Sequence, residues 1–162
     1  MPNNQFPIEF GSHTSNCLLC STTLFLLPTI YAFSHSFLQY YGMLSLITTL
    51  ISWNHWRHGQ INSIARKLDL VCSKLAFGIY FVSGWIFMSV RPLLLVIALP
   101  STFFIIQAYR YSTILWNEDN SNWVYAHMIF HLFAAYTKCI VLYSGVQYYM
   151  MFSENSVLNI SL

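Results

Sequence analysis

Charged residues are scarce in this chain. Seven Lys and Arg and five Asp and Glu make up 7% of its 162 residues, whereas about a quarter of an ordinary globular chain is charged. Hydrophobic residues make up 56% of the chain and aromatic residues 18%. So few charges cannot give a chain of this size a solvated surface, which excludes a soluble globular protein. The net charge of +2 is too small and too scattered to indicate nucleic-acid binding.

Two further features are missing. No Lys or Arg precedes the first apolar segment, so the sequence predicts no cleaved signal peptide and a first span that stays in the mature protein. Cys17 and Cys20 have the CxxC spacing of zinc-binding proteins, but the chain has no second pair to complete a tetrahedral site. We therefore interpret both cysteines as buried thiols.

Long apolar segments fill most of the chain. A helix needs about 20 predominantly apolar residues to cross a bilayer. The expected spans are residues 17–33, 36–54, 68–90, 92–109 and 123–151. The sequence thus predicts an all-α, polytopic transmembrane bundle of about five spanning helices. Its single bundle domain covers residues 17–151, between a polar N-terminal tail (1–16) and a polar C-terminal tail (152–162).

Lys and Arg are unevenly distributed between the two ends of the expected spans. Arg57, Arg66, Lys67 and Arg110 lie at one membrane face, and only Arg91 lies at the other. Short loops rich in Lys and Arg tend to stay in the cytoplasm. The sequence therefore predicts a multi-pass integral membrane protein whose N-terminus faces the cytoplasm.

A pair of histidines begins the last apolar segment. His127 and His131 are four residues apart and therefore lie on one face of a helix. Two imidazoles placed in this way can bind one divalent metal ion, as they do on metalloprotease helices. Ionisable groups inside membrane spans also tend to be functional. The alternative is that both rings are bonded to the backbone or to water on a face that points into the bundle.

Five spans bring other polar residues to the same membrane face as this pair. His55 and His58 lie where the second span ends, and Asp69 lies where the third begins. Catalytic zinc sites commonly use three protein ligands and leave one position open for water. We therefore predict a zinc ion bound by His55, His127 and His131, with His58 as the alternative to His55.

Asp69 and Ser52 complete the predicted catalytic site. Zinc lowers the pKa of a bound water to about 7, which makes hydroxide available at neutral pH. Asp69 is expected to accept the proton of that water. Ser52, one turn before His55, is expected to donate a hydrogen bond to the water or to a developing oxyanion.

Together these motifs resemble the CREST superfamily of membrane hydrolases, which includes the alkaline ceramidases and the progestin/adiponectin receptor family. A Ser-then-His pair ends one helix, the segment Arg66-Lys67-Leu68-Asp69-Leu70 begins the next, and HxxxH lies on the last. The resemblance covers residues 52–75 and 124–135. It implies a zinc ion held by three histidines and hydrolysis of an amide bond in a membrane lipid, with a ceramide or similar sphingolipid as substrate.

The chain also departs from that family. Its members have seven helices, so one hairpin between the Asp helix and the HxxxH helix is absent here, and the walls of the substrate cavity are expected to differ. Ser52 stands three residues before His55, whereas the family's serine usually stands four before. Glu9 is the only acid near the N-terminus, so the acidic calcium cluster of the ceramidases is not identified.

The resulting interpretation is a zinc-dependent lipid amidohydrolase. One alternative is a non-catalytic multi-pass protein or receptor with a structural zinc site, and another is a bundle whose histidines pair without metal. Lys138 lies two helical turns beyond His131. Because a bare charge inside a membrane is unfavourable, we expect Lys138 to pair with a polar group inside the bundle or to snorkel, rather than to bind a lipid phosphate or carboxylate.

Overall fold

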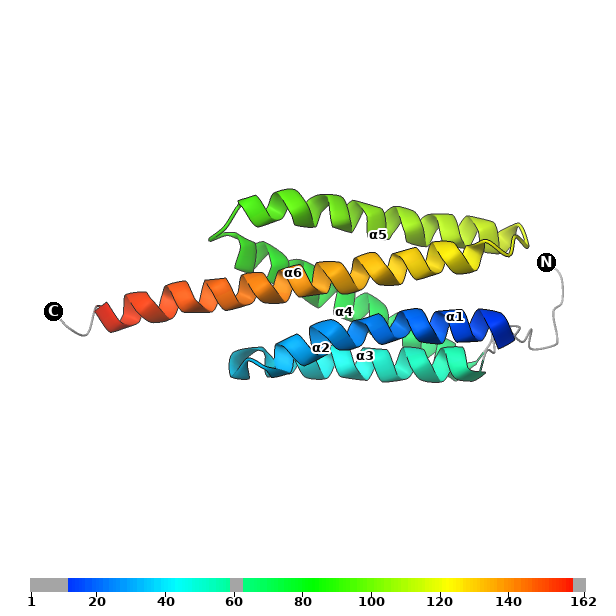
Figure 1. Cartoon of the computed structure of the whole chain (residues 1–162), viewed down its shortest axis with the longest axis horizontal. Coiled ribbons are helices and arrows are strands. Elements are labelled where there is room, and N and C mark those ends of the chain that lie inside the picture. Colours follow the sequence, from blue (N-terminus) through cyan, green and yellow to red (C-terminus); the bar gives the residue numbers. More distant parts are fainter. Residues whose placement is uncertain (1–11, 59–62, 159–162) are drawn as a thin grey trace.

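The structure, a computed structural model, describes residues 12–58 and 63–158 of the chain. These residues form five helical rods that run side by side, with no strand among them (Figure 1). The predicted all-α helical bundle is therefore confirmed. Because the N-terminal residues 1–11, the segment 59–62 and the C-terminal residues 159–162 lie outside the described residues, parts of both expected tails are not assessed.

The first rod is interrupted in the way that its proline predicts. It consists of α1 (Ser12–Thr22), the 3-10 turn η1 (Thr23–Phe25) and α2 (Leu26–Phe33). Pro28 has no N–H to donate to the carbonyl group four residues earlier, and its ring crowds that turn. The tighter 3-10 turn lies at this point and orients the buried Phe25 ring toward the bundle interior.

The other four rods follow in order. After the 3-10 turn η2 (Ser36–Leu38) come α3 (Gln39–His58), α4 (Ile64–Met88), α5 (Leu93–Asn117) and α6 (Trp123–Leu158). Several helices extend beyond the expected spans: α1 begins at Ser12 and α6 continues to Leu158. Hydropathy marks only the apolar part of a helix, whereas backbone hydrogen bonding continues into the polar residues beyond it.

Four rods are long and apolar enough to cross a membrane: the first rod, α4, α5 and α6. The helix α3 is not among them, because its last turns carry Asn54, His55 and Arg57. It also carries several hydroxyl residues on its buried side. The hydroxyl of Ser45 donates to the carbonyl of Phe25 at 3.3 Å, and Thr49 donates to Ser45 of its own helix at 2.7 Å. Burial and hydrogen bonding therefore let a polar helix pack inside an apolar bundle.

The outer surface of the bundle is apolar. Large side chains such as Ile64 and Leu93 are about three-quarters exposed, and many other aliphatic and aromatic residues lie on the same outer faces of α4, α5 and α6. A soluble protein does not leave so much contiguous apolar area in contact with water. The surface is that of an integral membrane protein whose helices face lipid.

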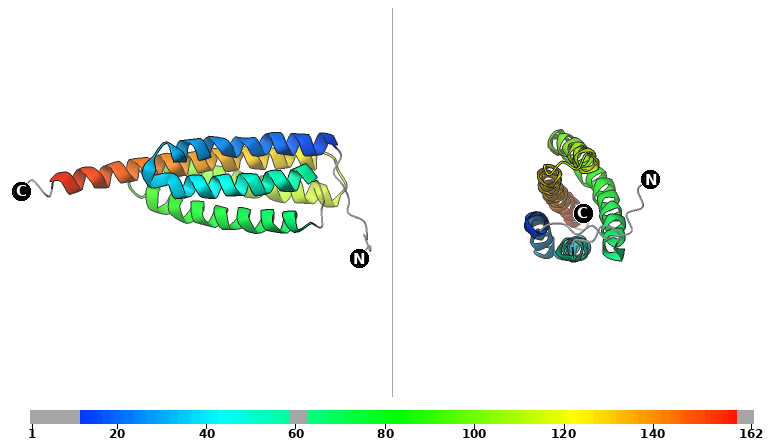
Figure 2. Two further views of the ribbon diagram at one scale, coloured as in Figure 1. Left: turned by 90° about the horizontal axis from the view of Figure 1, so that it is seen from below. Right: turned by 90° about the vertical axis from the view of Figure 1, so that its right-hand side faces the viewer.

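Helix α6 is the central element of the bundle. It packs against α1, α2, α4 and α5, whereas α5 is held almost entirely by α6. The end-on view in Figure 2 shows α4 and α5 diverging after the turn that joins them. The two helices form a wedge that is narrow at their shared turn and wide where α4 begins and α5 ends. Toward the narrow end α4 also approaches α6 closely, since a Cβ atom on Gly84 would lie 3.2 Å from Cγ2 of Val141.

Two local motifs fix the chain at this wide end. Ser63 caps α4 by accepting a hydrogen bond from the backbone N–H of Arg66 at 3.2 Å. Asp119 adopts a left-handed conformation (φ 52°) after α5. The N–H groups of Asp119 and Asn120 bond to the carbonyls of Trp116 and Leu115, the pattern of a Schellman motif. This motif turns the chain directly into α6.

Candidate functional site

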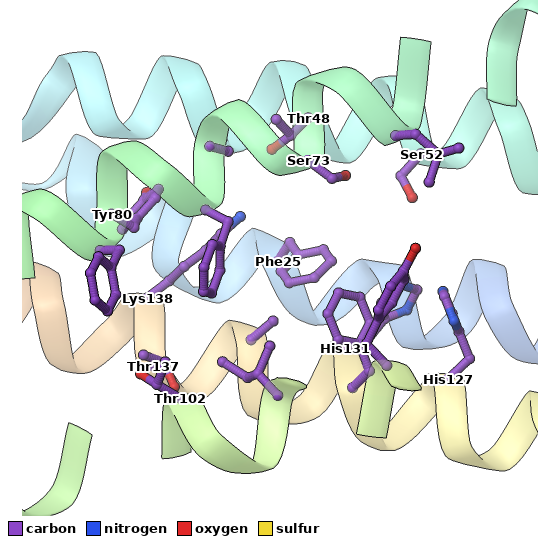
Figure 3. Close-up of a pocket in the computed structure, with 18 of the residues that line it drawn as sticks. Phe25, Thr48, Ser52, Ser73, Tyr80, Thr102, His127, His131, Thr137 and Lys138 are labelled. Atoms are coloured by element: carbon purple, nitrogen blue, oxygen red, sulfur yellow. The ribbon is translucent and has the colours of Figure 1, made fainter. Parts of the chain in front are cut away.

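A cavity of about 290 Å³ lies inside the bundle, lined by residues from η1, α3, α4, α5 and α6. It reaches from Trp56, in a small apolar cluster with Leu18 and Val124, to Tyr80 and Met88, in the larger apolar core near the α4–α5 turn. Its polar lining residues come from different helices (Figure 3). The cavity is the one place where the chemistry predicted from the sequence is gathered.

The predicted site residues on three helices come together at this cavity. The shared lining is made by two residues from α3, one from α4 and two from α6: Ser52, His55, Asp69, His127 and His131. His55 and His131 are each only 3% exposed. The side chain of His58 lies outside the described residues, so its place relative to the cavity is not assigned.

The histidines are linked by a tryptophan that the sequence analysis did not single out. The ring centroid of Trp56 lies 4.3 Å from that of His55 and 5.3 Å from that of His127. The His127 and His131 ring centroids are 4.8 Å apart. Trp56 therefore contacts His55 of α3 and His127 of α6 at once. Trp56, which lies at the end of the second expected span, is therefore part of the wall of the site.

His131 has a defined hydrogen-bond partner on the first rod. The Oγ atom of Ser21 lies 2.8 Å from Nδ1 of His131, and it also donates its proton to the carbonyl of Leu18 at 3.0 Å. Because a hydroxyl has a single proton, Ser21 accepts the hydrogen bond from Nδ1–H of His131. The lone pair of the neutral ring is then on Nε2, which is the nitrogen left for a metal ion or a ligand.

Asp69 is the only acid on the cavity wall. The hydroxyls of Ser52 and Ser73 lie beside its carboxyl group. Its Oδ1 atom is buried and has no hydrogen-bond partner within the described ranges. A buried carboxylate oxygen without a partner is unfavourable, which makes this atom a position where a water or a substrate group would be stabilised.

The fit to a zinc ion is partial. Within residues 12–58 and 63–158, no three His, Cys, Asp or Glu side chains lie close enough together to hold a metal ion. The neighbouring His127 and His131 match the ligand type, and the hydrogen bond from Nδ1–H of His131 is of the kind that orients a metal-binding imidazole. A third ligand from α3 would have to move toward this pair.

Lys138 lies deeper in the same cavity. Its Nζ atom is 4.4 Å from the ring centroid of Phe25 and 5.2 Å from that of Tyr80. No hydrogen bond or ion pair to Lys138 is found among the described residues, and it also interacts electrostatically with His131 and Cys139. The expected internal pairing is therefore not found, and its Nζ extends into the pocket rather than toward a membrane face (Figure 3).

No protein-family model, curated protein or solved structure matches the chain. The functional interpretation therefore depends on the residues that line the cavity and on the motifs that carry them.

Proposed function

We propose that the protein is a zinc-dependent intramembrane hydrolase of the CREST type that cleaves an amide bond in a ceramide-like lipid. The observation that carries the proposal is the convergence of Ser52, Asp69 and three imidazoles, from α3 and α6, on one buried cavity. The sequence motifs that resemble this superfamily are the same ones that meet there. Such a meeting has no structural purpose in a bundle that only needs apolar contacts.

Lipid access to the cavity follows from the arrangement of α4 and α5. Both helices line the cavity, yet they scarcely contact each other beyond their shared turn. A hairpin that the family places between them is absent, which leaves this side for lipid. A cavity of about 290 Å³ is at the lower limit of the ~300–1,000 Å³ of ligand pockets. A two-chain substrate would therefore keep one chain in the bilayer.

The residues have separate roles in this proposal. His127 and His131 would hold the zinc ion through Nε2, with His55 as the third ligand and His58 as the alternative. Bound zinc would lower the pKa of a coordinated water to about 7. Asp69 would accept the proton of this water at its buried Oδ1 atom.

Ser52 would orient the reacting groups. Its hydroxyl lies beside the Asp69 carboxyl group, so it can hold that carboxyl in place or donate to an oxyanion at the substrate carbonyl. The positive residues near this end of the bundle, which include Arg66 on α4 and Arg110 on α5, support an orientation with the histidine end toward the cytoplasm.

The test is turnover of a fluorescent ceramide by the purified full-length protein. Asp69→Asn should reduce turnover ~10²–10⁴-fold, the usual contribution of a general acid–base group, while the chain still binds zinc. Glu118→Gln, which changes an exposed acid on the α5–α6 loop, is the matched control and should leave turnover unchanged. Equal turnover by the Asp69→Asn variant and the wild type would reject the proposed base.

One structural observation favours a second candidate. The described residues contain no three metal-ligating side chains in binding distance, and His131 is already bonded to Ser21. A non-catalytic membrane protein or receptor, whose histidines need only pack and form hydrogen bonds, would suit this arrangement. Absence of amide-lipid turnover, whether or not the protein binds zinc, would select this candidate over the hydrolase.

A further inference from the structure

The inner end of the cavity carries a positive charge that the proposed hydrolase does not use. Lys138 is the central residue of the candidate span Trp123–Ser153, so it is about 22 Å along the helix from either end at a rise of 1.5 Å per residue. Its Nζ atom extends into the cavity, toward the rings of Phe25 and Tyr80 (Figure 3). In this structure the ammonium group therefore lies in the cavity rather than snorkelling to an end of the span.

Among the described residues, no acid is placed to neutralise this charge. Asp69 is the only described acid on the cavity wall, and it precedes Tyr80, the neighbour of Lys138, by about three helical turns, or roughly 16 Å along α4. Lys138 instead contacts the faces of Phe25 and Tyr80. Cation–π contacts stabilise an ion by less than its desolvation destabilises it.

A second polar group at the same level also lacks a partner. Thr137, the residue before Lys138, lines the cavity, and its buried Oγ1 atom has no hydrogen-bond partner in the part of the chain that the structure describes. Threonine hydroxyls inside helices usually donate to a carbonyl of the preceding turn, as Thr102 does to Ala98 at 2.9 Å. The two groups lie on consecutive residues but point apart: the Thr137 side chain lies beside Thr102 of α5, whereas Lys138 extends away from it across the cavity (Figure 3).

We propose that this inner end of the cavity, formed by Lys138, Thr137, Phe25 and Tyr80, binds the carboxylate of a single-chain fatty acid. A monoanion neutralises the one ammonium group, whereas a phosphate monoester would leave excess negative charge in an apolar site. A fatty acid is also the acyl product of the proposed hydrolysis, but the site is inferred from Lys138 and its binding requires neither zinc nor turnover, so it can be tested when the proposed function fails.

The rest of the cavity suits the hydrocarbon chain. Its lining between Lys138 and the histidines is mostly apolar and includes Ala76, Phe77, Leu99 and Ile105. The chain would lie along these residues and leave toward lipid on the side where α4 and α5 diverge (Figure 2). The small volume of about 290 Å³ favours one chain over the two of a phospholipid.

The experiment measures retention of three radiolabelled oleoyl probes by the purified full-length protein: oleate, uncharged oleamide and oleoyl lysophosphatidate. Wild type should retain oleate more tightly than the other two. Lys138→Met, which keeps an unbranched side chain, should weaken oleate binding about 10- to 100-fold, the range for a lost hydrogen bond to a charged group. The same variant should leave oleamide binding unchanged, and Lys138→Arg should keep most oleate binding.

Lys74→Met is the matched control, because Lys74 is exposed on α4, and it should bind oleate like the wild type. Equal oleate binding by Lys138→Met and wild type overturns the proposal. Tighter binding of lysophosphatidate than of oleate overturns the assignment to a carboxylate.

Should Lys138→Met fail to fold, the wild type is treated with oleate and a hydrophobic carbodiimide, which joins a bound carboxylate to an adjacent amine. An oleoyl amide at Lys138 supports the site, and amides only at Lys67 or Lys74 overturn it.

Discussion

The Oγ atom of Ser21 lies 2.8 Å from Nδ1 of His131, which joins two residues 110 positions apart in the sequence. Because Ser21 also donates to the carbonyl of Leu18, it accepts the hydrogen bond from Nδ1–H of the imidazole, which leaves the lone pair on Nε2. This hydrogen bond connects the first rod to the central helix at the level of the proposed metal ligands. It makes α1 part of the site.

Ser21→Ala should therefore affect zinc binding as well as stability. Losing the hydrogen-bonding partner of a ligand typically reduces metal affinity ~10–100-fold, and losing one buried hydrogen bond lowers the free energy of unfolding by about 1 kcal/mol. Zinc titration against a competing chelator measures the first effect. Ser89→Ala is the control, since Ser89 only donates to its own helix at Ile86. Unchanged zinc affinity in Ser21→Ala would mean that His131 is not a ligand.

The third zinc ligand is expected to be His55. It is buried and lies against Trp56, which in turn contacts His127. His55→Ala should lower zinc affinity by more than the ~10–100-fold typical of losing a ligand's hydrogen-bonding partner, and His58→Ala should leave it nearly intact. The same chelator competition compares the two variants. If neither substitution lowers the affinity, the three-histidine site is wrong.

The loop between α5 and α6 should face the cytoplasm. Ser121 is exposed in this loop and is a better position for a single cysteine than Asp119, whose positive φ of 52° disfavours most side chains. In a variant that lacks the native cysteines, Ser121→Cys should react in intact cells only with a maleimide that crosses the membrane. Labelling by an impermeant maleimide would reverse the orientation.

The close approach of α4 and α6 should be sensitive to side-chain volume. A Cβ atom on Gly84 would lie 3.2 Å from Val141, whereas no atom lies within 4 Å of one on Gly78. Gly84→Leu should therefore destabilise the bundle by about 1–3 kcal/mol, the usual effect of overpacking. Gly78→Leu on the same helix should not lower the thermal midpoint in detergent. Equal midpoints for the two variants would contradict the packing described here.

The sequence predicts the bundle well because lipid imposes a simple pattern. Long apolar runs mark four of the rods, and Pro28 marks the interruption of the first. The meeting of Ser52, His55, Asp69, His127 and His131 at one cavity follows from the number and order of the helices. Each of these features depends on local composition or on the number of times that the chain crosses the membrane.

Other features depend on contacts that no local pattern encodes. Ser21 is an ordinary serine in an apolar run, and only the packing of α1 against α6 brings it to His131. Trp56 reads as an interfacial residue until the rotation of α3 is known. Lys138 has no hydrogen bond or ion pair within the described residues, and this likewise depends on which side chains pack around it. Rotation of helices about their axes is set by packing, which hydropathy does not report.

The zinc content of the purified full-length protein tests the central claim most directly. Elemental analysis should give about one zinc ion per chain, as expected for a single site of three histidines and water. His127→Ala and His131→Ala should each lose this zinc, while His35→Ala, whose ring bonds to Tyr31, should retain it. A wild-type protein without zinc after supplementation, or zinc unchanged in His127→Ala and His131→Ala, would contradict the account.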